Sequence, residues 1–352
     1  MQKPKKSVRR KNSGVTIGEV AALAGVSPMT VSRVINNQGK VREATRETVM
    51  RAVRELNYTP NLAASSLAAA QHTRIALVYT DPSGAYLREM LVGLLRVASN
   101  TAVQLVVDYW DELDADAEAN AARKLVGRVD GVILPPPVCE SGAAVAELVK
   151  GGVPVVAIAS GRFAGEVSCV RIDDFHAGKE MAGHLIAQGH ARIGFICGRA
   201  GLSVSERRYE GFAAALQEAG LKIDPELVQE GDYTYRSGLV AAERLLAHAN
   251  PPTAIFASND DMAAAAVSVA HRRGLDVPRD LSVVGFDDTS TATTVWPELT
   301  TMHQPIASMA NDAVEILLRA IRHKGDQPRA LVDHVVPHRV ISRGSVAAPP
   351  AG

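Results

Sequence analysis

The sequence predicts a small all-α headpiece with a helix-turn-helix, followed by an α/β body of two lobes, each with a doubly wound parallel sheet. Three observations lead to this prediction. The N-terminal segment is basic and carries helical patterns joined by a glycine, apolar strands alternate with amphipathic helices over the rest of the chain, and the length is 352 residues. At roughly 150 residues per domain, that length suits two or three folded units.

The net charge of the chain is zero, with 38 basic and 38 acidic side chains, but the charge is unevenly distributed. From Met1 to Gln71, twelve Lys and Arg residues and four Glu residues give a balance of +8, which leaves −8 for the rest. A basic segment ahead of an acidic body indicates that the first part contacts a polyanion. The alternative, a disordered basic tail on an ordinary enzyme, fits only residues 1–13, because the following segment is strongly patterned.

Composition and cysteine usage exclude several classes of protein. Hydrophobic residues make up 47% of the chain, which excludes a disordered chain and suffices for a sizeable core. The sequence contains no run of about 18 apolar residues, which a membrane-spanning helix needs. Met1–Lys11 lacks the apolar segment of a secretory signal. We therefore expect a cytoplasmic, nucleoid-associated protein without membrane contact, in which Cys139, Cys169 and Cys197 are small buried side chains.

The headpiece is predicted to contain three helices. A capping box begins the first helix at Thr16, and Gly25 supplies its left-handed stop. Ser27 and Pro28 begin a second helix, since serine caps well and proline is tolerated in the first turn. A third helix over Glu43–Leu56 places an apolar stripe over the other two. Two short helices joined by a glycine turn are the helix-turn-helix, whose second helix enters the major groove of DNA.

This headpiece resembles that of the LacI/GalR (lactose repressor) family of transcriptional regulators. The resemblance is carried by Val15-Thr16-Ile17, Val20-Ala21, Ala24 to Ser27, Thr30 to Asn36, Thr45-Arg46 and Leu56 to Asn61. It implies double-stranded, palindromic operator DNA as a partner. The predicted DNA-binding residues are Thr16, Ser27, Pro28, Met29, Thr30, Ser32, Arg33, Asn36, Lys40, Tyr58, Asn61 and Leu67.

Base readout is expected from the helix that begins at Pro28. Arg33 suits a guanine, because its fork of donors matches the O6 and N7 acceptors. Pro28 and Met29 replace the polar pair of the lactose repressor and can make only apolar contacts, for instance with a thymine methyl; alternatively, Met29 is a core residue. In the family, the segment matching residues 61–71 is a hinge helix over the minor groove, and Leu67 matches its wedging leucine. The alternative is an alanine-rich linker helix.

The body alternates strands and helices from Ile75 onward, which predicts parallel sheets covered on both faces. The predicted strands are Ile75–Tyr79, Val103–Asp108, Val132–Leu134, Val153–Ala157, Ile193–Cys197, Thr253–Ala257 and Leu281–Phe286. The predicted helices include Ala85–Ser99, Asp114–Val126, Phe175–Gln188, Arg208–Ala219, Arg236–Ala247 and Asp260–Arg273. We expect a basic flexible tail (1–13), the headpiece (14–60), the hinge helix (61–71), the two-lobed body (72–340) and a flexible C-terminal tail (341–352).

Polar residues follow several of the predicted strands, where ligands of doubly wound sheets bind. Each could be a helix cap or a surface charge, but together they suit a polyhydroxylated ligand. The body also contains Gly189-His190, Arg208 to Phe212, Ala257 to Asp260, Val284 to Asp288, and Leu299 to Thr301 with Gln304. In these motifs it resembles the periplasmic-binding-protein-like core of the same family, and the resemblance implies a sugar-like effector in the cleft between the lobes. The predicted effector-binding residues are Tyr86, Arg208, Tyr233, Asn259, Asp287 and Gln304. Ala159 departs from the aspartate that several members carry after the fourth strand.

The predicted function is a sequence-specific DNA-binding regulator, a repressor of carbohydrate-utilisation genes controlled by a sugar-like effector. No phosphate loop, G-x-S-x-G motif or H-E-x-x-H motif is present, so we expect no enzyme activity, catalytic residue, cofactor or metal. Two other functions are a solute receptor for transport and a sugar-handling enzyme with an accessory DNA-binding domain. One recognition helix reads DNA weakly, so we expect a homodimer, and a tail without leucine heptads argues against a tetramer.

Overall fold

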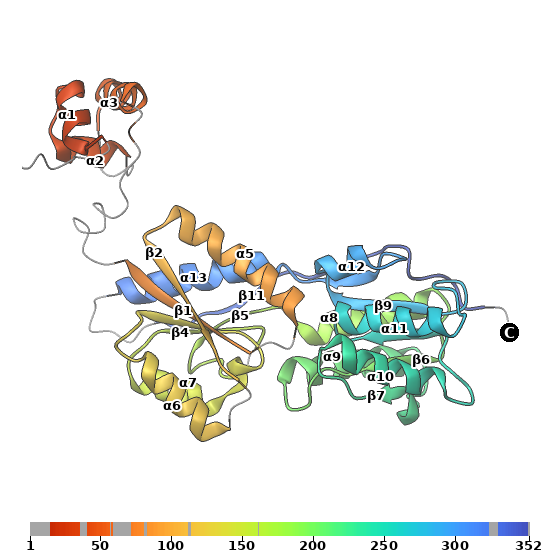
Figure 1. Ribbon diagram of the computed structural model, residues 1–352. Coiled ribbons are helices and arrows are strands. Elements are labelled where there is room, and N and C mark those ends of the chain that lie inside the picture. Colours follow the sequence, from red (N-terminus) through yellow and green to blue (C-terminus); the bar gives the residue numbers. More distant parts are fainter. Residues whose placement is uncertain are drawn as a thin grey trace, which may run out of the picture. The chain divides into compact units, whose positions relative to one another are not determined.

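The computed structural model describes residues 15–35, 41–56, 58, 72–80, 83–111, 114–160, 162–323 and 330–350. The chain divides into two compact units, Met1–His72 and Thr73–Gly352. Both are drawn in Figure 1.

The described part of the first unit contains three helices: α1 (Ile17–Ala24), α2 (Pro28–Ile35) and α3 (Glu43–Glu55). The capping box at the start of α1 is formed, because Thr16 N–H donates to the Glu19 carboxylate over 2.7 Å while Thr16 Oγ1 accepts from Glu19 N–H. Gly25 ends α1 with a φ of 66°. Ser27 Oγ accepts from the N–H of Thr30 over 3.2 Å and so caps α2.

The core of this unit is a small apolar cluster contributed by all three helices. Its buried members are Val20, Ala21, Val31, Val34, Val49 and Ala52. Because Val31 and Val34 use one face of α2 for this core, the opposite face of α2 is left to solvent.

The first lobe of the second unit, called the N-lobe, has a six-stranded sheet in the order β11-β5-β4-β3-β1-β2. Its strands are β1 (Thr73–Tyr79), β2 (Val103–Tyr109), β3 (Gly131–Leu134), β4 (Val155–Ile158), β5 (Ser168–Arg171) and β11 (Asp333–Val335). Its helices are α5 (Gly84–Asn100), α6 (Ala115–Leu125), α7 (Gly142–Lys150) and α13 (Ile306–Arg322). A 3₁₀ turn covers Val138–Glu140. Neighbouring strands pair in parallel. Helices α6 and α7 lie on one side of this sheet and α5 and α13 on the other (Figure 1).

The second lobe, called the C-lobe, has a six-stranded sheet in the order β12-β10-β9-β8-β6-β7, in which only β12 runs antiparallel to its neighbour. Its strands are β6 (Ile193–Ile196), β7 (Val228–Gln229), β8 (Ala254–Ala257), β9 (Ser282–Asp287), β10 (Thr300–His303) and β12 (Arg339–Ile341). Its helices are α8 (Asp174–Ala187), α9 (Ser203–Glu218), α10 (Tyr235–Leu246), α11 (Asp260–Arg272) and α12 (Ser290–Thr294). A 3₁₀ turn covers Pro225–Leu227. Helix α8 packs with α9, and α10 packs with α11.

The chain passes between the two lobes three times: after β5, after β10 and after β11. Consequently α13 follows a C-lobe strand in sequence but packs on the N-lobe sheet beside α5. The other expected helices of the body lie within one residue of the observed bounds at each end, whereas α9 does not. Helix α9 begins at Ser203 rather than at Arg208, so Arg208 lies inside the helix and not near its start. The early turn of α9 contains Val and Ser residues, whose weak helix propensity hides the boundary in the sequence.

The prediction of a flexible C-terminal tail is wrong for residues 341–350. Ile341 ends strand β12, and Arg343 forms an ion pair of 2.6 Å with Asp288. Ser345 is fully buried; its Oγ accepts from Thr300 N–H over 2.8 Å and donates to the carbonyl of Val283 over 2.5 Å. The small and polar composition of this segment suggested mobility, but backbone groups of β9 and β10 hold it.

We expect Ser345→Ala to lower the free energy of unfolding by about 1–3 kcal/mol, because it leaves a buried backbone N–H and a buried carbonyl without their partner. Ser342→Ala is the matched control, since Ser342 is exposed and its loss should change stability by less than about 0.5 kcal/mol. Denaturant titration of both variants checks this. Equal stability of the two variants would contradict the role of Ser345 in holding the segment.

The three cysteines are free; Cys139 and Cys169 are buried and Cys197 is half-buried. Across the described ranges, no three His, Cys, Asp or Glu side chains gather in a way that could hold a metal ion. Over the same residues, the structure has no helix with the length and apolar character needed to cross a membrane.

Candidate functional site

A cavity of about 60 Å³ lies between the N-lobe and the C-lobe. All six predicted effector-binding residues line it, together with nine residues that were not predicted to contact a ligand. One of these nine is Ala159, which departs from the aspartate that several members of the family carry. The lining residues are Tyr79, Thr80, Ser83, Tyr86, Leu87, Met90, Pro135, Pro136, Ala159, Val204, Arg208, Tyr233, Asn259, Asp287 and Gln304.

The topology explains why these residues meet. The carboxyl ends of parallel strands lie at one edge of a sheet, and the segments that follow them form the ligand crevice. In the N-lobe, Thr80 and Ala159 directly follow β1 and β4. In the C-lobe, Asn259 lies two residues beyond β8, Asp287 ends β9, and Gln304 directly follows β10.

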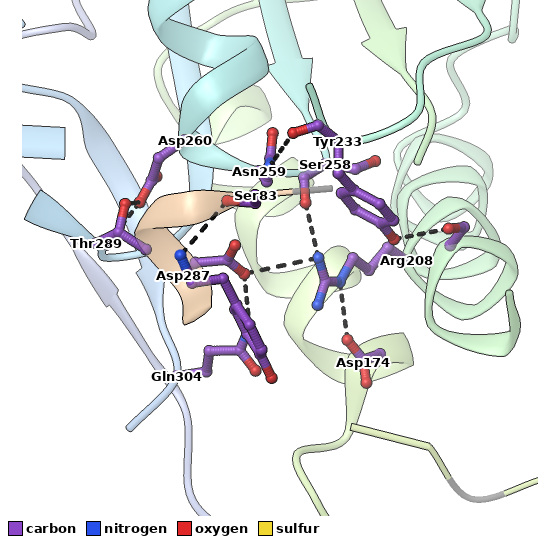
Figure 2. A network of polar contacts seen from close by, with 12 residues as sticks. Ser83, Asp174, Arg208, Tyr233, Ser258, Asn259, Asp260, Asp287, Thr289 and Gln304 are labelled. Atoms are coloured by element: carbon purple, nitrogen blue, oxygen red, sulfur yellow. Dashed lines mark hydrogen bonds and ion pairs between the residues drawn. The ribbon is translucent and has the colours of Figure 1, made fainter. Parts of the chain in front are cut away.

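Arg208 is at the centre of the polar network in Figure 2. Its Nε donates to Asp174 over 2.8 Å, and its Nη1 donates to the carbonyl of Ser258 over 2.7 Å. Nη1 also lies 3.8 Å from Asp287 Oδ1, and the guanidinium stacks 3.7 Å from the centre of the Phe286 ring. Arg208 is therefore both a cavity-lining residue and a structural ion-pair partner. The partner is Asp174, whereas Glu210 pairs with Arg207.

Burial controls the protonation of the acids around Arg208. It raises the pKa of Asp287 to about 7, although Arg208 and a hydrogen bond from Gln304 act in the opposite direction. Burial likewise raises the pKa of Asp174, against the attraction of Arg208. By contrast, burial of Asp288 is outweighed by hydrogen bonds from His303 and Arg343, so its pKa is lowered. Two adjacent aspartates thus have pKa values shifted in opposite directions.

We expect Asp287→Asn and Asp288→Asn to change stability with opposite dependence on pH. The raised pKa of Asp287 means that its favourable contribution is complete below pH 4 and is lost as the pH rises to about 7. Asn keeps an acceptor for Gln304 without the charge, so Asp287→Asn should gain thermal stability over wild type as the pH rises from 5 to 8.

The lowered pKa of Asp288 means that its contribution is present above pH 4 and is lost as the pH falls. Asp288→Asn should therefore melt below wild type at neutral pH, and the difference should shrink in acid. Melting temperatures of both variants between pH 3.5 and 8 check this pair. Parallel pH profiles for the two variants would contradict it.

Strained backbone is concentrated at the cavity. Among the described non-glycine residues, four have a positive φ: Ala159 (56°), Tyr233 (73°), Asp287 (104°) and Asp288 (57°). Three of them line the cavity, and the fourth is adjacent to Asp287. Such conformations cost about 1–3 kcal/mol each and cluster at ligand sites, where the surrounding structure holds them.

Tyr233 is held rigidly at the cavity wall. Its hydroxyl shares a hydrogen bond of 2.6 Å with Ser205 Oγ, and its ring lies against Gly198. A Cβ at Gly198 would come within 2.2 Å of Tyr233 Cζ, so any side chain there would displace the ring. The tyrosine ring is therefore held in a fixed position at the cavity wall.

Asn259 and Asp260 combine capping with cavity formation. Asn259 Oδ1 caps α11 by accepting from Met262 N–H over 2.9 Å, and Asn259 Nδ2 donates to the Tyr233 carbonyl over 2.8 Å. Asp260 accepts from the N–H and the hydroxyl of Thr289 and from the Thr301 hydroxyl. Asn259 therefore acts as a helix cap, which was one of the alternatives for the polar residues after the strands. The amide of Asn259 also holds the backbone of Tyr233 in place.

Several buried polar atoms at the cavity have no hydrogen-bond partner. They are Thr80 Oγ1, Tyr86 Oη and Gln304 Oε1, three of the five such side-chain atoms among the described residues. A buried polar atom without a partner costs about 1–3 kcal/mol. Their position on both lobes indicates that the cavity accommodates polar groups of a ligand.

Two hydrogen bonds connect the lobes on either side of the cavity. Ser83, the N-cap of α5, donates to Asp261 over 2.8 Å, and Ser203 in the first turn of α9 donates to Glu140 over 2.5 Å. Sequence reasoning did not identify these contacts or Asp174, because each joins residues far apart in the chain.

The predicted DNA-reading helix presents its readout residues to solvent. Pro28, Met29 and Arg33 are exposed, and Met29 is 64% exposed, so it is not a core residue. Tyr58 packs against the core of the headpiece. Thr16 and Ser27 cap helices, as described above. The predicted DNA contacts Asn36, Lys40, Asn61 and Leu67 lie outside the described residues, as does the hinge segment 61–71.

Comparison with known proteins relates both units to one family. Residues 16–61 match the bacterial regulatory proteins of the lacI family, and residues 182–346 match a periplasmic binding protein-like domain. Catabolite control protein A of Priestia megaterium is 35% identical over 94% of this chain and 99% of its own length. The chain belongs to the LacI family. The regulator GalR of Escherichia coli K12 is 34% identical to this LacI-family chain, over 95% of it and 96% of GalR.

Solved structures of LacI-family proteins agree with this assignment. A complex of the transcriptional regulator CelR with cellobiose shares 33% identity and a TM-score of 0.71, covering 94% of this chain and 99% of that chain. A structure of the Lac repressor dimer bound to operator and the anti-inducer ONPF shares 27% sequence identity and a TM-score of 0.71, and the match covers 96% of this chain and 100% of that chain. The predicted fold class is confirmed, and this LacI-family member is a DNA-binding transcriptional regulator. Its relatives are regulators and not enzymes.

Proposed function

We propose that this LacI-family regulator represses carbohydrate-utilisation genes and is controlled by a small sugar-like ligand bound between the N-lobe and the C-lobe. The observation that carries this proposal is the set of unpartnered polar atoms on Thr80, Tyr86 and Gln304 at the cavity. Vicinal hydroxyls can satisfy such atoms because each hydroxyl both donates and accepts. The CelR–cellobiose complex supports a carbohydrate as the ligand.

The switch follows from the size of the cavity and the contacts that close it. A volume of about 60 Å³ is far below the roughly 300 Å³ or more of typical ligand pockets, so a sugar enters only when the lobes separate. After the ligand has entered, the hydrogen bonds Ser83–Asp261 and Ser203–Glu140 between the lobes form again if the bound ligand leaves room for the lobes to close. A ligand changes operator affinity only if it prefers one arrangement of the lobes.

The proposed active species is a homodimer on a palindromic operator with half-sites about 10 base pairs apart. Four apolar side chains of the N-lobe support this: Val92 and Leu95 on α5, and Val107 and Tyr109 on the edge strand β2, are between 38% and 57% exposed. Exposed apolar side chains on the edge strand of a sheet and on the helix that packs against it are typical of a protein interface. Sedimentation of Leu95→Asp checks this, since a charge in the interface should produce monomers.

The test of the proposed function has two steps. Thermal shifts of the purified protein with neutral sugars identify a ligand, because binding to the native state alone raises the melting temperature. Fluorescence anisotropy with labelled operator then measures DNA affinity with and without that sugar. A sugar that binds and changes operator affinity at least tenfold supports the proposal. A sugar that binds without changing operator affinity contradicts it.

A further inference from the structure

The ionisable groups around the cavity are unequally balanced. Among the described residues that line it, Arg208 is the one cation, and its partners Asp174 and Asp287 are both buried acids. The side chains of all three are at most 7% exposed. A third buried carboxylate, Asp260, accepts hydrogen bonds only from neutral donors. Burial raises the pKa of Asp260 well above its usual range, so Asp260 adds no charge near neutral pH. Asp174 and Asp287, once ionised, outnumber the single guanidinium of Arg208 by one charge.

The guanidinium of Arg208 is largely committed to the protein. Its Nε and Nη1 already donate to Asp174 and to the Ser258 carbonyl, and Phe286 covers one face of it. A ligand anion at this place would share one positive charge with two carboxylates only 2.8 and 3.8 Å away. Burying a charge without a counter-charge of its own is strongly unfavourable.

Helix N-termini, the usual alternative for binding an anion, are also engaged by protein carboxylates. Asp261 accepts from the N-cap hydroxyl of α5, and Glu140 accepts from Ser203 at the start of α9. The first turn of α11 itself carries Asp260 and Asp261. The N-termini of α5, α9 and α11 therefore already face an acidic side chain.

The described residues of the N-lobe wall add no charge. Its polar side-chain groups are the hydroxyls of Tyr79, Thr80, Ser83 and Tyr86. The apolar and aromatic lining residues of this wall are Tyr79, Leu87, Met90, Pro135, Pro136 and Ala159. Such a wall suits the C–H face of a sugar ring or an apolar substituent. To a phosphate or a carboxylate its hydroxyls offer hydrogen bonds but no positive charge.

We propose that the cavity selects an uncharged ligand and excludes anionic sugars, both phosphorylated sugars and sugar acids. The hydroxyls of the ligand meet Arg208, Asp287 and Gln304 on the C-lobe side, and its apolar face meets the N-lobe wall. This inference rests on the proposed function, because it specifies the ligand class of the same cavity. The excluding element is the excess of buried carboxylates around a single guanidinium.

The test compares each neutral sugar with its anionic derivative on the full-length protein. Calorimetric titrations use glucose with glucose 6-phosphate, ribose with ribose 5-phosphate, galactose with galacturonate, and cellobiose with cellobionate. We expect the tightest ligand of the panel to be neutral and to bind at least tenfold more tightly than its anionic partner. An anionic member that binds as tightly as its neutral parent, or more tightly, overturns the proposal.

A variant separates local charge from overall charge. Asp174 touches Arg208 without lining the cavity, so Asp174→Asn should free the guanidinium and reduce the preference for the neutral sugar several-fold. Asp116→Asn removes the same charge from an exposed position on α6 and should leave the preference unchanged. Equal effects of the two variants would overturn the local origin of the selection. Operator binding measured with the same sugars keeps the proposed function separate, since a neutral sugar can bind selectively without changing DNA affinity.

Discussion

Arg208→Ala is expected to abolish the ligand response and to lower the free energy of unfolding by about 3–5 kcal/mol at pH 8. The stability effect arises because the substitution leaves the buried carboxylates of Asp174 and Asp287 without a cation. Removal of the guanidinium should raise the pKa of both acids further, since Arg208 makes the largest contribution against the effect of burial on each of them. The destabilisation should therefore be smallest near pH 5, where Asp287 is protonated.

Arg207→Ala is the matched control for this prediction. Arg207 is adjacent in sequence, but it forms an exposed pair with Glu210, which contributes only about 0–1 kcal/mol. Ligand titrations at pH 6, with and without operator DNA, measure the functional effect on folded protein. We expect Arg208→Ala to keep its operator affinity within a few-fold in the absence of ligand. A variant that still responds at wild-type ligand concentrations would exclude Arg208 from the site.

Local patterns in the sequence predicted most helices and strands, because each depends on neighbours within a few residues. The capping box at Thr16 and the glycine stop at Gly25 form as expected. Periodicity also fixes which face of a strand or helix is buried, as for Val31 and Val34 in α2. The polar residues after β8 and β9 could be identified because parallel strands bring their carboxyl ends together. Gln304 follows β10, which was not among the predicted strands, and its place at the ligand was implied by the family resemblance.

The remaining features depend on contacts between distant segments, which local patterns do not report. Helix α13 has a clear apolar repeat, but its place on the N-lobe follows from a chain crossing, and consecutive elements are usually expected to be neighbours. Asp174 pairs with Arg208 across 34 residues. The C-terminal segment looks mobile by composition, whereas Ser345 is buried by backbone partners from β9 and β10.

Arg33→Ala is expected to cost about 1–3 kcal/mol of binding free energy for each recognition helix on the operator, which is about 5- to 150-fold in affinity. Arg33 is exposed in the last turn of α2, while Val31 and Val34 fix the opposite face of the helix in the core. The guanidinium can therefore reach a base edge without rearrangement of the headpiece. In a dimer the loss occurs once in each half-site, so the effect on the whole complex should be about twice as large.

The matched control is Arg54→Ala, which removes an exposed arginine from α3 instead. This variant should lose at most one contact with the DNA backbone. The loss of a backbone contact weakens binding to all DNA sequences alike and reduces the salt dependence of binding. Arg33→Ala should instead flatten the preference at one base pair of each half-site, because a bidentate contact with one base is lost. Binding of both variants to operators substituted at each position, and to DNA without an operator, distinguishes the two effects. If Arg33→Ala weakened binding equally on every substituted operator, Arg33 would contact the phosphate backbone, and base readout by α2 would have to rest on Pro28 and Met29 alone.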